Sequence, residues 1–538
     1  MTANDEPASV DPWTRYAVIA GWAFVALGIV ARLLRYLLAF PLWHDECMLA
    51  DNFLSRSYAG LLDPLDHCQV APLGFLWAEL TSTRLFGFNE YSLRLPALVG
   101  GIGALLVVHR LATRWLSPLS GLLATALCAC SYYPIRHSAE VKPYSTDMFF
   151  SAALLALAIA WWREPTRLRR LWALVGLAPV AIASSFPAVF VAGGIGLGMF
   201  AAACKSRRRV TWFAVLAYGL SIAVAFGLVY RLSSAAQEAR SGAQMREFWK
   251  ESFPPPASEP WNWLGWMAST HTGEMFAYPV GSDHGGSIIT SLLVVVGIVA
   301  LARRRAYVPL AMIGGTFALA YVAAALHRYP YSNNSRMVLY LGPIVILLAA
   351  EGAARLLSRP PTRWVVVARW ATVVLLSMFP VGMMLRDLTH PYKHSQDWQH
   401  CGFARWFWRH QTDHAQLMCL GEGLEHDLWG DADRSQFRCY RQIYAPRQAL
   451  AADPTQVPGN EDVLCVMFVP YGQSPDAASF DRWMSAMSER YRLAEHEAFP
   501  VDLERHDHPI PSSTYELYRF VPKANIELGR LPNTTTLR

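Results

Sequence analysis

Charged residues are scarce in this chain of 538 residues, because Asp, Glu, Lys and Arg make up only 16% of it. An ordinary soluble protein contains about 25% of these residues. Hydrophobic residues make up 53% and gather in long runs, so the sequence predicts an α-helical polytopic membrane protein and excludes a soluble protein with a large core. The net charge of +6 comes from Arg clusters between the apolar runs, which indicates membrane topology and no nucleic-acid partner.

About eleven apolar segments are candidates for crossing a bilayer, which takes roughly 17–25 residues. They cover residues 16–40, 93–111, 119–135, 145–162, 171–186, 187–204, 210–230, 287–302, 307–326, 337–355 and 364–385. The first is too long for a signal-peptide core and has no small-residue cleavage site after it, so we interpret it as an uncleaved anchor. Residues 72–86 are apolar but short and carry Glu79 and Arg84, which favours a juxtamembrane or re-entrant helix.

Every second loop between these segments is short and rich in Arg or Lys, which predicts that those loops and the N-terminus are cytoplasmic. The opposite loops are then external: residues 41–92, 132–144, 231–286, 327–336 and everything after about 386. We therefore expect a transmembrane catalytic domain at 1–389 and a soluble extracytoplasmic, or periplasmic, domain at 390–538, in a protein of the inner or plasma membrane.

The C-terminal region has the composition of a small α/β domain. Strand-like runs lie at 415–420 and 463–470, and a helix-like segment lies at 480–491. Six of the nine cysteines are external by this map, which permits disulfides in an oxidising compartment. Cys47 with Cys68 could close the first external loop, while free buried thiols remain the alternative. The other four allow three pairings, and none has zinc-finger spacing: Cys401, Cys419, Cys439 and Cys465.

Two adjacent acids, Asp45 and Glu46, follow the first apolar segment directly, beside Trp43 and His44. A carboxylate pair at the bilayer surface is by default a candidate functional site. Two other external turns, 132–147 and 327–336, are also dense in acids, bases and aromatic residues. The three clusters predict one site at the outer membrane surface.

Acids and cations in an interfacial cleft suit sugar transfer from a lipid phosphate. Such a donor already has a good leaving group, so the acceptor hydroxyl needs only a general base, for which Asp45 or Glu46 is the candidate. A carboxylate can also stabilise oxocarbenium character. The phosphate needs cations, for which Arg336 and Lys142 are the candidates.

The ordered motifs resemble those of the GT-C glycosyltransferases. They are Trp43-His44-Asp45-Glu46, Gln69-Val70-Ala71-Pro72-Leu73, Phe86-Gly87 with Ser92-Leu93-Arg94-Leu95-Pro96, Glu140-Val141-Lys142-Pro143-Tyr144 with Asp147, and Arg336 followed by Tyr340 and Pro343. The resemblance covers about residues 16–385. It is nearest to the branch of protein O-mannosyltransferases and lipid A aminoarabinose transferase, the glycosyltransferase family 39-like branch.

This resemblance implies a GT-C fold and transfer, with inversion, from a polyprenyl-phosphate-linked sugar to an external lipid, glycan or protein. It implies Asp45 as catalytic base with Glu46 as a catalytic or supporting acid. It also implies a donor-phosphate group of Lys142, Arg336, Arg94 and Tyr340, and a supporting group of His44, Gln69, Glu140, Tyr144 and Asp147. Some relatives bind a divalent metal ion, for which His67 is a weak candidate ligand.

Plainer interpretations remain beside these. Asp45 and Glu46 could cap a helix, Lys142 and Glu140 could form a local ion pair, and Arg336 and Arg94 could anchor the chain at lipid headgroups. A lipid-linked sugar flippase or another transporter is a second hypothesis, although transporters usually show internal repeats, which this sequence lacks. A non-catalytic membrane scaffold is the third.

Overall fold

The computed structural model describes residues 12–206, 208–282, 285–331, 334–357, 363–410, 416–420, 428–444, 461–469, 477–501 and 513–524. Two compact units divide the chain. The first, here the bundle unit, comprises Met1–Ala39, Arg56–Leu85 and Tyr91–His390. The second, here the sheet unit, comprises Phe40–Ser55, Phe86–Glu90 and Pro391–Arg538. The sheet unit therefore contains the segment with Asp45, which the sequence alone assigns to the membrane part.

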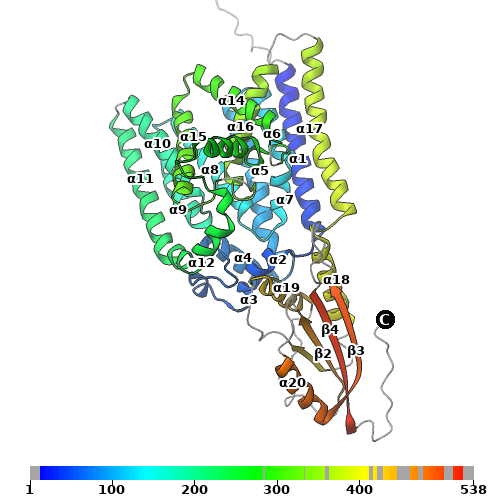
Figure 1. Cartoon of the computed structure of the whole chain (residues 1–538). Coiled ribbons are helices and arrows are strands. Elements are labelled where there is room, and N and C mark those ends of the chain that lie inside the picture. The colour runs from blue at the N-terminus through cyan, green and yellow to red at the C-terminus, as the bar shows by residue number, and fades with distance from the viewer. Residues whose placement is uncertain are drawn as a thin grey trace, which may run out of the picture. The chain divides into compact units, whose positions relative to one another are not determined.

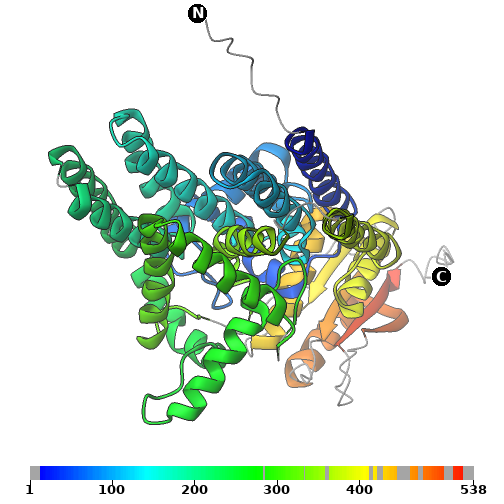
Figure 2. The same ribbon diagram turned by 90° about the horizontal axis from the view of Figure 1, so that it is seen from above.

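The bundle unit is helical, and its long helices run beside one another (Figures 1 and 2). Each of the eleven apolar segments expected from the sequence coincides largely with a helix, and 119–135 is divided between two helices. The helices are α1 (Pro12–Leu37), α4 (Leu73–Phe86), α5 (Leu95–Trp115), α6 (Pro118–Cys130), α7 (Tyr132–Arg136), α8 (Tyr144–Arg163), α9 (Leu168–Ser184), α10 (Ala188–Ser206), α11 (Arg209–Val229), α12 (Ala235–Phe248), α13 (Pro260–Thr272), α14 (Ile288–Arg303), α15 (Tyr307–Ala325), α16 (Gly342–Leu357) and α17 (Arg363–Thr389). Short 3-10 turns lie at Gly60–Leu62, Ser92–Arg94, His137–Ala139, Lys250–Ser252, Glu274–Phe276 and Leu339–Leu341.

Eight helices in the described part of the chain are long and apolar enough to cross a membrane. A ninth span is added if α6 and the helical turn at Tyr132–Ala139, bent by 52° to each other, count as one. The remaining two expected segments form shorter helices, α9 with 17 residues and α14 with 16. Helix α4 has only 14 residues, in agreement with its interpretation as a helix that does not span the membrane.

The predicted external loop at 231–286 begins as a helix. A π-helical turn at Tyr230–Ser234 joins α11 to α12, so that Arg209–Phe248 forms 40 residues of nearly continuous helix. A search for apolar runs misses this continuity because α12 is polar in composition. One of its polar residues, Gln237, is nevertheless buried and donates a hydrogen bond to the carbonyl of Ala71 over 3.3 Å.

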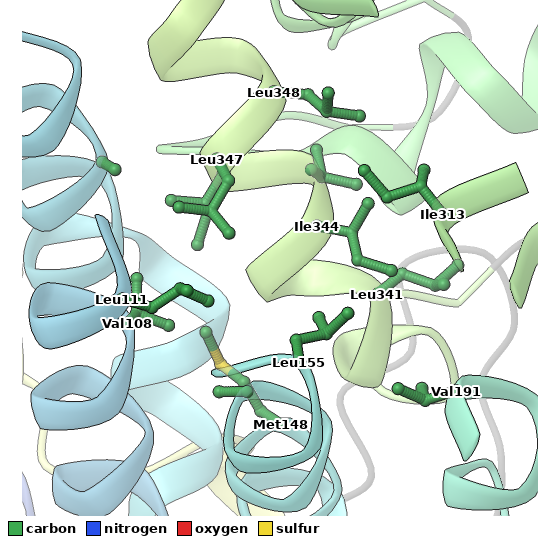
Figure 3. Packing of buried hydrophobic residues seen from close by; sticks show 14 of the residues in the cluster. Val108, Leu111, Met148, Leu155, Val191, Ile313, Leu341, Ile344, Leu347 and Leu348 are labelled. Atoms are coloured by element: carbon green, nitrogen blue, oxygen red, sulfur yellow. The ribbon is translucent and has the colours of Figure 1, made fainter. Parts of the chain in front are cut away.

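The bundle core is built from apolar side chains of many helices, and Figure 3 shows part of it, where residues of α5, α8, α10, α15 and the stretch from Leu339 through α16 meet. Glycines bring some of these helices very close together. A Cβ added at Gly352 of α16 would lie 1.9 Å from the carbonyl oxygen of Leu293 in α14, and one at Gly297 would lie 2.1 Å from that of Leu348. Small residues at such contacts are how membrane helices gain packing energy.

A buried ion pair joins the two helices α1 and α17. Nη1 of Arg35 lies 2.6 Å from Oδ1 of Asp387, and the two side chains are 5% and 6% exposed. Neither charge can be removed alone without leaving the other in a site of low dielectric.

The sheet unit contains a four-stranded sheet in the order β1-β2-β4-β3. The parallel pair is β1 (Gln416–Leu420) with β2 (Val463–Val469), and β4 (Ser513–Pro522) runs antiparallel to both β2 and β3 (Tyr491–Val501). The predicted strands at 415–420 and 463–470 and the helix at 480–491 are confirmed, except that residues 415 and 470 lie outside the described part. The helix is α20 (Ala477–Arg490), whereas β3 and β4 were not predicted.

Helices cover both faces of this sheet. Alternate residues of β2 and β4, such as Cys465 and Phe520, pack with Trp483 of α20. The residues between them, such as Tyr515, face α18 (Ser395–His410) and α19 (Leu428–Tyr444): Phe403 of α18 stacks on Tyr515 with ring centroids 3.9 Å apart, and Phe437 of α19 lies 5.9 Å from it. Helix α19 in turn packs against α2 (His44–Ala50), which α3 (Asn52–Ser55) follows.

The suggested disulfide between Cys47 and Cys68 is absent, because both residues are free thiols. Helix α2 buries Cys47 against α19, where it is hydrogen-bonded to Cys439, and Cys68 lies in the loop before α4 with a φ of 51°. Cys401 and Cys439 are free as well. The side chain of Cys419 and residues 332 and 333 of the expected fourth external turn lie outside the described part of the chain.

Candidate functional site

Asp45 and Glu46 occupy the first turn of α2, which starts at His44. The Glu46 carboxylate folds back and accepts a hydrogen bond of 3.0 Å from the backbone N–H of Trp43. This is the capping arrangement that satisfies a donor at a helix start, and Glu46 is fully buried by it. Asp45, one residue earlier, is only half-buried. The sequence leaves the role of Glu46 open, and the structure shows that its carboxylate caps the start of α2.

A cluster of cationic and imidazole side chains surrounds the start of α2 within the sheet unit. Nζ of Lys393 lies 4.5 Å from the centre of the Trp43 ring, at the distance of a cation–π contact. The His44 and His394 rings lie 4.8 and 6.1 Å from the same ring. Lys393 and His394 belong to the C-terminal region, and no motif in the sequence pointed to them.

His400 of α18 is buried near His44. Burial, and after it the neighbouring His44, lowers the pKa of His400 to about 3. Its Nδ1 lies 2.8 Å from the hydroxyl of Tyr515 on β4. His400 is therefore a neutral side chain that connects the sheet to the surroundings of α2.

In the bundle unit, Lys142 and Gln69 come together although they are far apart in sequence. Nζ of Lys142 donates to Oε1 of Gln69 over 2.7 Å, and Lys142 is buried at 6% exposure. The contact joins the loop before α4 to the turn before α8.

Glu140 of the same turn bonds to two cationic or potentially cationic groups. Its carboxylate accepts from Nε of Arg136 over 3.2 Å and lies 2.8 Å from Nδ1 of His137. Glu140 and His137 are buried. These contacts fix the turn that carries Lys142.

Asp147 lies in the first turn of α8 among tyrosines of later segments. Burial raises the pKa of Tyr329 well above its ordinary value, and nearby Asp147, Tyr340 and Tyr144 raise it further. The Tyr329 and Tyr340 rings lie 6.3 Å apart. The structure thus brings together three residues that the sequence singled out, Asp147, Tyr144 and Tyr340, and adds Tyr329, which it did not.

Arg336 lies in the predicted fourth external turn, with its guanidinium 5.0 Å from the centre of the Trp249 ring. Three of the predicted external segments meet beside it. The Glu274 carboxylate accepts from the hydroxyl of Tyr133 over 3.0 Å and from the backbone N–H of Ser335 over 2.6 Å. Glu274 is therefore an unpredicted residue that holds the turns of Tyr133 and Arg336 together.

Arg94 and His67 are less closely tied to these groups. Arg94 is 1% exposed at the start of α5 and lies within electrostatic reach of Tyr36 of α1. His67 adopts a left-handed conformation with a φ of 56°. Among the residues that the structure describes, no three His, Cys, Asp or Glu side chains are grouped as metal ligands, so we derive no step through a metal ion.

No family model matches the sequence, and no curated protein matches it. The structure is similar to that of ArnT from Cupriavidus metallidurans bound to undecaprenyl phosphate, with 13% identity and a TM-score of 0.51 over 92% of this chain and 98% of that chain. This chain has the GT-C fold. The apo form of the same ArnT gives a TM-score of 0.49 over 93% of this chain and 98% of the other, at 13% identity.

An archaeal oligosaccharyltransferase, AglB from Archaeoglobus fulgidus in complex with an inhibitory peptide and a dolichol-phosphate, is a more distant match. Its TM-score is 0.44 at 12% identity, over 82% of this chain and 69% of that chain. The fold assignment therefore depends on ArnT, and it agrees with the GT-C fold expected from the ordered motifs.

Proposed function

We propose that this membrane protein is a GT-C glycosyltransferase that moves a sugar from a polyprenyl-phosphate donor to an acceptor hydroxyl outside the cytoplasm. The observation that carries the proposal is the first turn of α2, where the Glu46 carboxylate caps the helix start and the neighbouring Asp45 is half-buried. The GT-C fold supports it, since ArnT has that fold and was solved with undecaprenyl phosphate.

In the proposed reaction Asp45 takes the proton of the acceptor hydroxyl. The acceptor oxygen then forms a bond to the anomeric carbon of the sugar while the bond from that carbon to the phosphate oxygen breaks. The electron pair leaves with polyprenyl phosphate. Attack from the side opposite the phosphate inverts the anomeric centre.

The leaving phosphate carries the negative charge that cations must balance. Lys142, buried and oriented by Gln69, and Arg336, held over Trp249, are proposed for this role, because an ammonium and a guanidinium are the usual phosphate partners. Arg94 and Tyr340 are proposed to support donor binding from the bundle unit, and Asp147 with Tyr144 to line the same region.

The alternating basic loops favour the extracytoplasmic side for α2 and the C-terminal region. The acceptor class stays open among lipid, glycan and protein. A sugar on a polyprenyl phosphate is the only substrate class on which the proposal depends.

The test is transfer from a polyprenyl-phosphate sugar by purified full-length protein carrying Asp45→Asn, Asp45→Ala or Glu164→Gln. Loss of the general base should lower kcat of Asp45→Asn by about 100-fold or more. Glu164, which pairs with Arg167 and Arg170, is the matched control and should retain activity. Wild-type rates in Asp45→Asn and Asp45→Ala would refute the assignment, and would agree with a flippase or a scaffold.

A further inference from the structure

One face of α19 is directed at the segment that carries the proposed base. Gln436, Cys439 and Tyr440 are spaced three and four residues apart, so they share a face of the helix. All three are buried. Their contacts are with Leu42 and Cys47, which flank the first turn of α2.

The two backbone polar groups of Leu42 are both held by α19 side chains. The N–H of Leu42 donates to the hydroxyl of Tyr440 over 3.0 Å. The carbonyl of Leu42 accepts from Nε2 of Gln436 over 3.0 Å and from the Tyr440 hydroxyl over 3.5 Å. These bonds hold the two peptide units on either side of the Leu42 Cα atom.

We propose that Tyr440 and Gln436 are positioning residues, which hold Leu42 and thereby set the place of Asp45 three residues later. The inference deepens the proposed function and rests on it for the role of Asp45. It assigns to the C-terminal region a part in catalysis, as the support of the helix that carries the base.

The support itself is rigid. Asp397 of α18 accepts a second bond from Nε2 of Gln436 over 2.9 Å, and Phe437, on the neighbouring face of α19, packs on Tyr515 of β4. Burial raises the pKa of Tyr440 well above its ordinary value, so its hydroxyl keeps its proton and can donate to Leu42 while accepting from it.

The short helix α2 transmits this constraint to Asp45. Its first turn is closed by bonds from the N–H groups of Glu46 and Cys47 to the carbonyl of Trp43, the residue next to Leu42. A catalytic group must stay within a fraction of an ångström of its working position, since a misplacement of about 1 Å can cost about 100-fold in rate. If Leu42 became more mobile, the first measurable effect would therefore be a lower kcat.

The first test compares Tyr440→Phe with Tyr444→Phe in full-length protein. Both substitutions remove one hydroxyl from α19, but the half-buried hydroxyl of Tyr444 donates to Glu90 over 2.7 Å and accepts from Nε of Arg405 over 2.8 Å. Tyr440→Phe should lower kcat about tenfold, with KM for the donor unchanged. Equal kcat in the two variants would overturn the proposal, and Gln436→Met provides a second variant with the same expectation.

The second test uses Cys47 and Cys439, which are hydrogen-bonded to each other, with Sγ of Cys439 3.6 Å from the Cys47 carbonyl. Diamide, an azo compound, should join them: a sulfur–sulfur bond forms, and the two thiol hydrogens with two electrons reduce the azo group to a hydrazine. The cross-link replaces the lost bond between α19 and α2, so it should restore kcat of Tyr440→Phe. Cross-linking without rescue would contradict a positioning role.

The closing experiment does not depend on activity. Hydrogen–deuterium exchange of the peptide at 40–47 should speed up about tenfold in Tyr440→Phe and stay at the wild-type rate in Tyr444→Phe. Unchanged exchange in Tyr440→Phe would overturn the positioning role. If wild-type protein transfers no sugar while exchange responds as expected, the proposed function fails and the role of α19 in holding α2 stands.

Discussion

His400 should make the sheet unit less stable in acid. Its folded pKa of about 3 lies below the value of about 6.5 for an exposed histidine, because the ring is fully buried and faces His44. Between these two values the unfolded chain binds a proton that the folded chain does not. Stability that is present above about pH 6.5 is therefore lost as the pH falls toward 3.

The size of the effect follows from the two pKa values. From pH 7.5 to pH 5 the contribution of His400 to the free energy of unfolding should fall by about 2 kcal/mol, at 1.36 kcal/mol for each pH unit below about 6.5. A change of this size corresponds to about 4 to 8 °C in Tm for a unit of this length. His400→Gln removes the titration, while its amide oxygen can still accept a bond from the hydroxyl of Tyr515.

The assay is thermal unfolding of wild-type and His400→Gln protein in detergent at about pH 7.5 and about pH 5. We expect the fall in Tm on acidification to be smaller in His400→Gln by about 4 to 8 °C. The same substitution at the exposed His390 of the bundle unit is the control and should leave the fall unchanged. An equal fall in wild type and His400→Gln would refute the argument.

Two further predictions concern the bundle unit. Gly352→Ala should destabilise the bundle unit by about 3 kcal/mol, since the new Cβ would lie 1.9 Å from the backbone oxygen of Leu293 and no rotamer change can relieve that clash. The control, Gly219→Ala in α11, has open space around it and should be neutral or slightly stabilising. Equal Tm values for the two variants would contradict the packing of α14 on α16. Asp387→Leu should cost about 3 to 5 kcal/mol by leaving Arg35 in a buried site without its carboxylate, and the double variant with Arg35→Met should regain most of the lost Tm; no recovery would argue against the ion pair as the cause.

The membrane helices could be predicted because a bilayer imposes one local requirement, a long apolar run, which a sequence displays directly. A long apolar run is not required where contacts with other segments determine the structure of a helix. Helix α12 continues α11 although its composition is polar. Hydropathy does not show this continuation, and Gln237 of α12 contacts Ala71, which is distant in the sequence.

Asp45 and Glu46 could be chosen as candidates because they stand together directly after a predicted span. The capping bond from Trp43 N–H to Glu46 could not be predicted, since it depends on how the chain folds at the start of α2. Tyr440 and Gln436 lie nearly 400 residues from Leu42 and carry no motif. Strand β3 was missed because its polar residues alternate only weakly with apolar ones, and its pairing with β4 decides its structure.

The most direct test of the central claim is a single turnover of the purified protein with a polyprenyl-phosphate sugar and an acceptor in excess, followed by the release of polyprenyl phosphate. The account predicts a fast release in wild type and in Glu164→Gln, and a release at least about 100-fold slower in Asp45→Asn with donor binding retained. Release from Asp45→Asn at the wild-type rate would contradict the claim that Asp45 is the general base of a glycosyltransferase.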